Sequence, residues 1–200
     1  MQQVLHQGGR RTDGEWLIVV PTIPSSPSSL RVTVWRRMRG AGALHLHGGL
    51  WVFPNRPEQE RLARAVLAQV RAAGGEVVLF VADVLEGLTP DAIRDRLGAE
   101  RDQEYAEFGE GCQEFLAEID KETAREKFTY PELEEIEDEL TKLQTWLRKI
   151  RERDFFGSAG SADGAHLLAT CAEAFDGYAH RVYAALGVET GDRGGEPGGG

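Results

Sequence analysis

The sequence predicts an α+β fold: a ferredoxin-like βαββαβ domain followed by an antiparallel helical bundle. Three observations predict this class. Short apolar runs and amphipathic stretches follow the order β-α-β-β-α-β up to about residue 84. From Thr89 onward, apolar residues recur every three or four positions, which is typical of packed helices. The charge also changes, because residues 1–83 carry ten basic and six acidic residues, whereas the remainder carries 13 basic and 27 acidic residues.

The first strand is predicted at the unbroken apolar run Trp16–Val20, a pattern typical of a strand buried on both faces, and Pro21 ends it. A helix follows the turn residues 25–29, and Gly40 and Gly42 provide its stop. Helical spacing predicts that its core-facing residues are Leu30, Val34, Trp35 and Met38.

Two short strands, 43–47 and 50–54, flank Gly48-Gly49, which is a two-residue hairpin signal. Such a turn pairs His47 with Leu50, and paired residues share a face. The side chains expected beneath the helices are then Leu44, Leu46, Trp51 and Phe53. Those expected on the open face are His45, His47, Leu50 and Val52. We interpret the histidines as polar surface residues rather than metal ligands, because no third ligand has local spacing.

A second helix is predicted from Pro57 and is closed by Gly74-Gly75, and the last strand is predicted at 77–81. The apolar face of this helix is expected to hold Leu62, Val66, Val70 and Ala73. We expect the apolar residues of the open sheet face to be covered either by the bundle or by a second subunit in a homodimer.

The bundle is expected to begin at the cap residue Thr89 with Pro90 in the first turn, and a second helix at Thr129-Tyr130-Pro131-Glu132, a capping box. Its apolar seams are predicted at Tyr105, Phe108, Cys112, Phe115, Ile119, Leu133, Ile136, Leu140, Leu143, Leu147, Ile150, Leu168, Cys171, Phe175, Tyr178 and Val182. The two cysteines are therefore interpreted as core residues. Four acids, Glu104, Glu107, Glu114 and Glu118, are interpreted as a solvated face rather than a di-metal site.

The expected organisation is a disordered N-terminus at 1–14, the ferredoxin-like domain at 15–84, the acidic helical bundle at 89–186 and a disordered glycine-rich tail at 187–200. No stretch approaches the roughly 20 apolar residues of a membrane span and no signal core precedes the first strand, so we expect a cytoplasmic protein without a membrane partner. Neither a nucleophile arrangement nor a phosphate loop is visible. We therefore expect no enzymatic activity and no cofactor.

Arginines of the two helices in the first part give the strongest functional signal, because they form stripes that could face phosphate. The candidate DNA-binding residues are Arg31, Arg36, Arg37, Arg39, Arg61, Arg64 and Arg71. If four to six of them meet phosphates, log affinity should fall against log salt with a slope near −4 to −5. The alternative interpretation is a solvated face.

The chain contains, in this order, the segments Trp16-Leu-Ile-Val-Val-Pro21, Arg31-Val-Thr-Val-Trp35-Arg36, Gly49-Leu-Trp-Val-Phe-Pro54, Asp102-Gln-Glu-Tyr105, and Trp146-Leu-Arg-Lys-Ile-Arg-Glu-Arg-Asp154-Phe-Phe-Gly157. Together these segments resemble the N-terminal region of the chromate-resistance proteins called ChrB. The resemblance spans about residues 16–186. It implies a regulator of chromate-resistance genes whose DNA binding lies in this region.

Full-length members of that family carry a further C-terminal domain linked to the chromate response. This chain shows a glycine-rich segment instead, so we expect it not to sense chromate by itself. The alternative function is a protein-interaction or dimerisation module that binds no nucleic acid.

Overall fold

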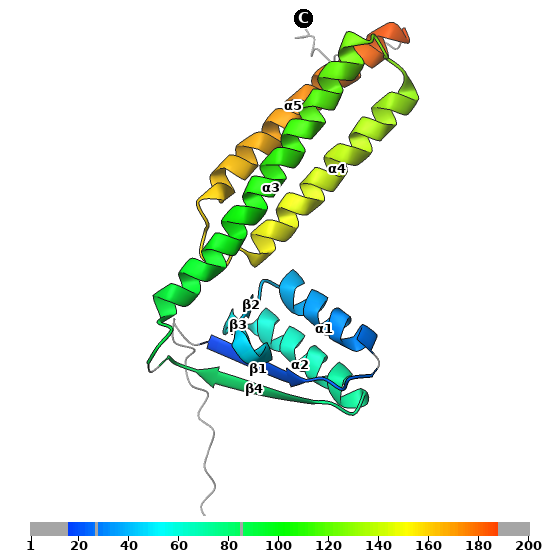
Figure 1. The fold of residues 1–200 in the computed structure, drawn as a ribbon. Coiled ribbons are helices and arrows are strands. Elements are labelled where there is room, and N and C mark those ends of the chain that lie inside the picture. The colour runs from blue at the N-terminus through cyan, green and yellow to red at the C-terminus, as the bar shows by residue number, and fades with distance from the viewer. Residues whose placement is uncertain (1–15, 27, 85, 188–200) are drawn as a thin grey trace, which may run out of the picture. The chain divides into compact units, whose positions relative to one another are not determined.

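The computed structural model describes residues 16–26, 28–84 and 86–187. The disorder expected at 1–14 and at 187–200 lies outside these residues, except for Gly187. Contacts within the chain divide it into two compact units. The first comprises residues up to 100 together with 152–157, and the second comprises 101–151 and the residues from 158 onward. Within the described residues the protein is α+β, with a four-stranded antiparallel sheet and five α-helices (Figure 1).

The first unit has the predicted element order. Its strands are β1 (Trp16–Thr22), β2 (Leu44–His45), β3 (Trp51–Pro54) and β4 (Glu76–Ala82), and its helices are α1 (Ser28–Gly40) and α2 (Pro57–Ala72). The strands lie in the order β2-β3-β1-β4, and each neighbouring pair is antiparallel. The predicted end of this strand at Pro21 is wrong, because β1 continues to Thr22. At Pro21 the pairing with β3 has ended, so among the described residues only β4 pairs with β1 there. Proline is tolerated at such a position because one side of the strand needs no hydrogen bond.

The hairpin register differs from the predicted one by one residue. Leu44 pairs with Val52 and His45 with Trp51, because five residues rather than two connect β2 to β3. Residues 47–49 form a short 3₁₀ turn, in which Gly48 and Gly49 have φ of 75° and 78°. The Leu46 N–H closes this loop by donating to the Leu50 carbonyl at 2.7 Å. A one-residue shift moves a side chain to the other face, so the predicted faces of Leu44, Leu46 and His45 are wrong.

Helices α1 and α2 cover one face of the sheet (Figure 1). The core beneath them contains Leu17, Val19, Trp51 and Phe53 from the strands. The helices contribute Leu30, Val34, Met38, Ala63, Val66 and Val70. Two predictions about these helices are wrong. Trp35 and Ala73 are exposed, because the buried stripes of α1 and α2 are already filled by neighbours one turn apart.

The other sheet face is covered in part by the same chain. Helix α3 (Pro90–Ala124) is preceded by Thr89, whose Oγ1 caps it by accepting a hydrogen bond from the Ala92 N–H at 3.2 Å. In its first turns, Ile93 and Leu97 pack with Trp16, Leu44 and Val52 in a buried cluster. These turns belong to the first unit. Val52 is therefore buried by α3 of the same chain.

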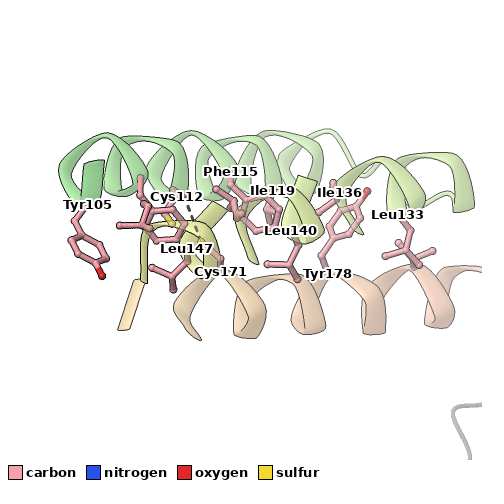
Figure 2. Close-up of a cluster of buried hydrophobic side chains, with 14 residues drawn as sticks. Tyr105, Cys112, Phe115, Ile119, Leu133, Ile136, Leu140, Leu147, Cys171 and Tyr178 are labelled. Atoms are coloured by element: carbon pink, nitrogen blue, oxygen red, sulfur yellow. Dashed lines mark hydrogen bonds between the residues drawn. The ribbon is translucent and has the colours of Figure 1, made fainter. Parts of the chain in front are cut away.

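The second unit is a three-helix bundle of the rest of α3 with α4 (Tyr130–Arg153) and α5 (Gly160–Ala185). Figure 2 shows its core, to which all three helices contribute. Every predicted seam residue of α3 and α4 is buried, and on α5 Cys171, Tyr178 and Val182 are buried while Leu168 and Phe175 are partly buried. The period of the apolar residues was thus sufficient to identify the bundle core. No helix of the described chain combines the length and apolar character needed to cross a membrane.

Candidate nucleic-acid interface

The outer face of α1 carries two arginines beside an exposed tryptophan. Leu30, Val34 and Met38 face the core, which leaves Arg31, Trp35 and Arg36 toward solvent. The Trp35 side chain is 52% exposed. Among the residues that the structure describes, neither Arg31 nor Arg36 has an ion-pair partner. Both guanidinium groups are therefore available to an external anion.

The other two arginines of α1 are held by the protein. The Arg37 Nη1 donates to the Gln69 Oε1 at 2.8 Å and so links α1 to α2. The Arg39 Nη1 donates to the Glu100 Oε1 at 3.0 Å, and its guanidinium lies 5.8 Å from the Trp35 ring centroid. These contacts tie α1 to its neighbours in the first unit. Arg39 also supports the exposed position of Trp35 by a cation–π contact.

The α2 arginines are mostly paired within their own helix. Arg64 makes a charged hydrogen bond to Glu60 at 2.7 Å, and Arg61 lies 3.9 Å from Glu58. Arg71 is exposed in the last turn of α2, where positive charge favours the helix dipole, and it has no ion-pair partner among the described residues. Thus four of the seven candidate arginines already have polar partners. The structure does not gather all seven into one uncompensated surface.

A shallow groove of about 290 Å³ lies beside Trp35, between α1 and the β2–β3 hairpin. Arg31 and Trp35 form one side, and His45 and Trp51 form the other. The His45 and Trp51 rings are 4.5 Å apart, which follows from their pairing in the sheet. The two rings are tilted by 50°, so His45 packs against the Trp51 ring at an angle. Among residues 16–26, 28–84 and 86–187, no group of three histidine, cysteine or acidic side chains is placed to hold a metal ion.

The sequence interpretation missed the exposure of Trp35, although a signal was present. Leu30, Val34 and Met38 recur at intervals of four and complete one buried stripe. Trp35 follows Val34 directly, so it is displaced by about 100° around the helix. An exposed tryptophan between arginines is a recognisable binding feature, since tryptophan and arginine are both enriched at interfaces.

The buried cysteines of the bundle are not part of a reactive site. Cys112 and Cys171 are both free thiols, and the Cys171 Sγ lies 3.7 Å from the Cys112 carbonyl oxygen. Burial raises the pKa of Cys112 to about 12, and the neighbouring Cys171 adds to this rise. Burial also raises the pKa of Cys171. Both thiols thus stay protonated at neutral pH, as their interpretation as core residues requires.

The sheet, the helical bundle and the arginine–tryptophan face define a two-part α+β protein with an exposed basic and aromatic helix in its first part. The family model described as Protein ChrB, N-terminal, matches residues 31–189. The chain therefore belongs to the ChrB N-terminal family, which connects it to chromate resistance. A comparison with curated proteins gave no match.

Proposed function

We propose that this protein is a non-catalytic regulatory module of the chromate-resistance family that acts in the cytoplasm and binds DNA through α1. The observation that carries the proposal is the outer face of α1, where Arg31 and Arg36 flank exposed Trp35 without ion-pair partners among the described residues. Arginine suits this role because its planar guanidinium binds phosphate oxygens with two parallel hydrogen bonds. The family assignment supports the same proposal.

We also propose that the first unit is a ferredoxin-like domain. The order β2-β3-β1-β4, with every neighbouring pair antiparallel and α1 and α2 on one face, supports this assignment. In RNA-recognition domains of this topology, aromatic residues of the central strands stack on bases. Here α3 covers Trp16 and Val52 on the equivalent face. We therefore assign nucleic-acid contact to the helices rather than to the sheet.

The test measures binding of a fluorescent DNA duplex from the region upstream of the protein's own gene over a series of salt concentrations. Replacing Arg31 and Arg36 together by alanine removes two phosphate contacts. The slope of log affinity against log salt should then become less negative by about 1.8, since each contact contributes about 0.9. Arg39 is kept, because its ion pair with Glu100 gives it a structural role.

The matched control replaces Arg61 and Arg64 by alanine, which removes the same charge from residues that already pair with Glu58 and Glu60. This control should change the slope by less than half as much. Equal slopes for wild type and the Arg31/Arg36 variant would contradict the α1 interface. Absence of any salt-sensitive binding by wild type would reject DNA binding and favour the alternative function.

The alternative function is a protein-interaction or dimerisation module, and one observation favours it. Val78 and Phe80 of β4 are 46% and 52% exposed, and they pair with Val20 and Ile18 on the sheet face that α3 covers only in part. An apolar strip of this kind commonly marks an interaction surface. Phe80→Glu should lower the sedimentation mass if a second copy covers the strip, and should leave the mass unchanged if the protein is a monomer.

A further inference from the structure

A second surface feature lies in the helical bundle, where α3 and α4 enclose a groove of about 530 Å³. Its apolar lining consists of Gly111, Phe115, Ile136, Leu143 and Trp146. Its acidic lining consists of Glu114, Glu118, Glu122, Glu132, Glu135 and Glu139. The only cation among the described lining residues is Lys142. The groove therefore combines an apolar strip with strongly acidic sides.

The apolar strip is kept open by a glycine. A Cβ atom at Gly111 would lie 3.0 Å from the Trp146 Cζ3, so a side chain there would push against the indole ring. The Trp146 indole is also restrained by the bundle core, because it packs edge-on against Phe108 with ring centroids 5.6 Å apart. One edge of Trp146 is thus fixed in the bundle core while the residue itself is only half-buried.

Most glutamates of the groove already have partners. Glu118 binds Lys121 at 2.7 Å, and Glu139 binds Lys142. Glu122 and Glu132 both bind Lys127, at 3.0 and 3.2 Å. The other two glutamates, Glu114 on α3 and Glu135 on α4, are exposed and have no ion-pair partner among the described residues. One carboxylate outside ion-pair distance of any described cation therefore stands on each side of the apolar strip, and Lys142 acts on Glu135 only at longer range.

The spacing of these two carboxylates defines what could meet them. A Cβ atom at Gly111 would lie 3.0 Å from the Trp146 ring, so Gly111 of α3 and Trp146 of α4 stand opposite each other and give the alignment of the two helices. Glu114 lies three residues after Gly111 on α3, and Glu135 lies eleven residues before Trp146 on α4. Because the two helices are antiparallel, both displacements run in the same direction along the groove. At 1.5 Å per residue they are offset by about 12 Å along the groove, or two turns of a helix. The apolar strip itself spans about 16 Å, or three helical turns.

We propose that this groove binds an amphipathic helix of another protein, with an apolar ridge flanked on both sides by arginine or lysine. The ridge would lie on Phe115, Ile136 and Trp146, and cations two turns apart would meet Glu114 and Glu135. A helical segment fits this groove, because its backbone groups are paired within the helix, whereas an added strand would need backbone partners that α3 and α4 do not offer. A fourth helix also completes the packing of a three-helix bundle. This proposal does not depend on DNA binding.

The test uses the full chain and a fluorescently labelled peptide of about four helical turns. The peptide carries leucines along one face and two arginines, one on each flank, two turns apart. Fluorescence anisotropy should show saturable binding of one peptide per chain. Intrinsic fluorescence should change as well, and Trp146→Phe should remove that change, because the other three tryptophans lie in the first unit.

Charge reversal gives the decisive comparison. Glu114→Lys with Glu135→Lys should weaken peptide binding at least tenfold. The matched control, Glu110→Lys with Glu137→Lys, changes the same charge on the same two helices at exposed residues outside the groove, and it should weaken binding less than threefold. A peptide with glutamates in place of the arginines should bind the Glu114→Lys/Glu135→Lys variant better than wild type. All four positions are exposed, so circular dichroism should show that each variant keeps its helices.

Three results would overturn the proposal. Equal weakening by the two charge reversals would show that only the overall negative charge attracts the peptide. Absence of saturable binding to wild type would show that the groove is not a helix site. A dimer of the protein alone that dissociates in the Glu114→Lys/Glu135→Lys variant would assign the groove to a second copy of this chain instead.

Discussion

Leu97→Ala tests whether the first turns of α3 stabilise the sheet of the first unit. The Leu97 side chain is 2% exposed and packs with Trp16, Leu44, Val52 and Ile93. Shortening it to alanine removes three carbon atoms, which costs about 2.4 kcal/mol at about 0.8 kcal/mol per buried CH₂. The cavity that remains adds to this cost. We therefore expect the free energy of unfolding to fall by about 3–5 kcal/mol.

The measurement is urea unfolding followed by tryptophan fluorescence in a Trp146→Phe background, where every remaining tryptophan belongs to the first unit. The matched control is Val32→Ala on α1, because Val32 is 47% exposed and its loss should change the free energy by less than about 0.5 kcal/mol. A loss below about 1 kcal/mol in Leu97→Ala would refute the reasoning, since α3 would then merely rest on the sheet. The covering residues belong to the same chain, so the sedimentation mass should not change.

Three further predictions concern single groups. Cys112 and Cys171 should react very slowly with a thiol reagent at mildly alkaline pH and both should react fully in denaturant, because burial raises both pKa values; fast labelling of the native protein would contradict this. Glu122→Gln should lower the urea midpoint at neutral pH, because Lys127 lowers the pKa of this 2%-exposed carboxyl below its ordinary 4.5. The stabilisation by Glu122 is present above that ordinary pKa and is lost as pH falls through the lower pKa of the folded protein. The urea midpoints of wild type and Glu122→Gln should therefore approach each other in acid. A difference between the midpoints that stays constant with pH would argue against the ion pairs. Gly75→Ala should lower the free energy of unfolding by about 1–3 kcal/mol, because the new Cβ would lie 2.6 Å from Val70 and 2.7 Å from the Thr22 carbonyl oxygen. The control is Gly98→Ala in α3, where a Cβ has no neighbouring atom within 4 Å. This control should be neutral or stabilising in the same unfolding assay.

The bundle core could be predicted from the sequence because it depends on local periodicity. Residues such as Phe108, Leu140 and Ile150 recur at helical spacing, and no alternative element accommodates so long a repeat. The element order of the first unit was accessible for the same reason. Both results come from patterns that lie within one or two neighbouring elements.

The register of the β2–β3 hairpin could not be predicted from the sequence, because it depends on the geometry of the loop. Gly48-Gly49 fits a two-residue turn, yet the Leu46–Leu50 hydrogen bond encloses three residues and moves the pairing by one position. Sequence alone cannot separate these alternatives, since both place glycine at positive φ. The consequence is that Leu44 joins Trp16 and Val52 beneath α3.

The ion-pair partners of the arginines also fall into two groups: those that the sequence can predict and those that depend on the fold. Glu58 and Glu60 stand three and four residues before Arg61 and Arg64, so those pairs follow from helical spacing and could have been predicted. Glu100 lies 61 residues from Arg39, and its ion pair depends on the fold. Distinguishing Arg31 and Arg36 from the other arginines therefore required the structure.

The grouping of residues also changes the electrostatic argument for DNA binding. Residues 1–100 with 152–157 contain thirteen basic and twelve acidic residues, a net charge of +1, and the rest of the chain carries −11. With so small a charge the first unit cannot attract DNA strongly from a distance, and affinity must come from short-range contacts. If Arg31 and Arg36 are the main contacts, the wild-type salt slope should be near −2 rather than the −4 to −5 expected for four to six arginines. The two proposed sites, the α1 face and the α3–α4 groove, therefore depend on local charge, and the salt series and the peptide titration test them separately.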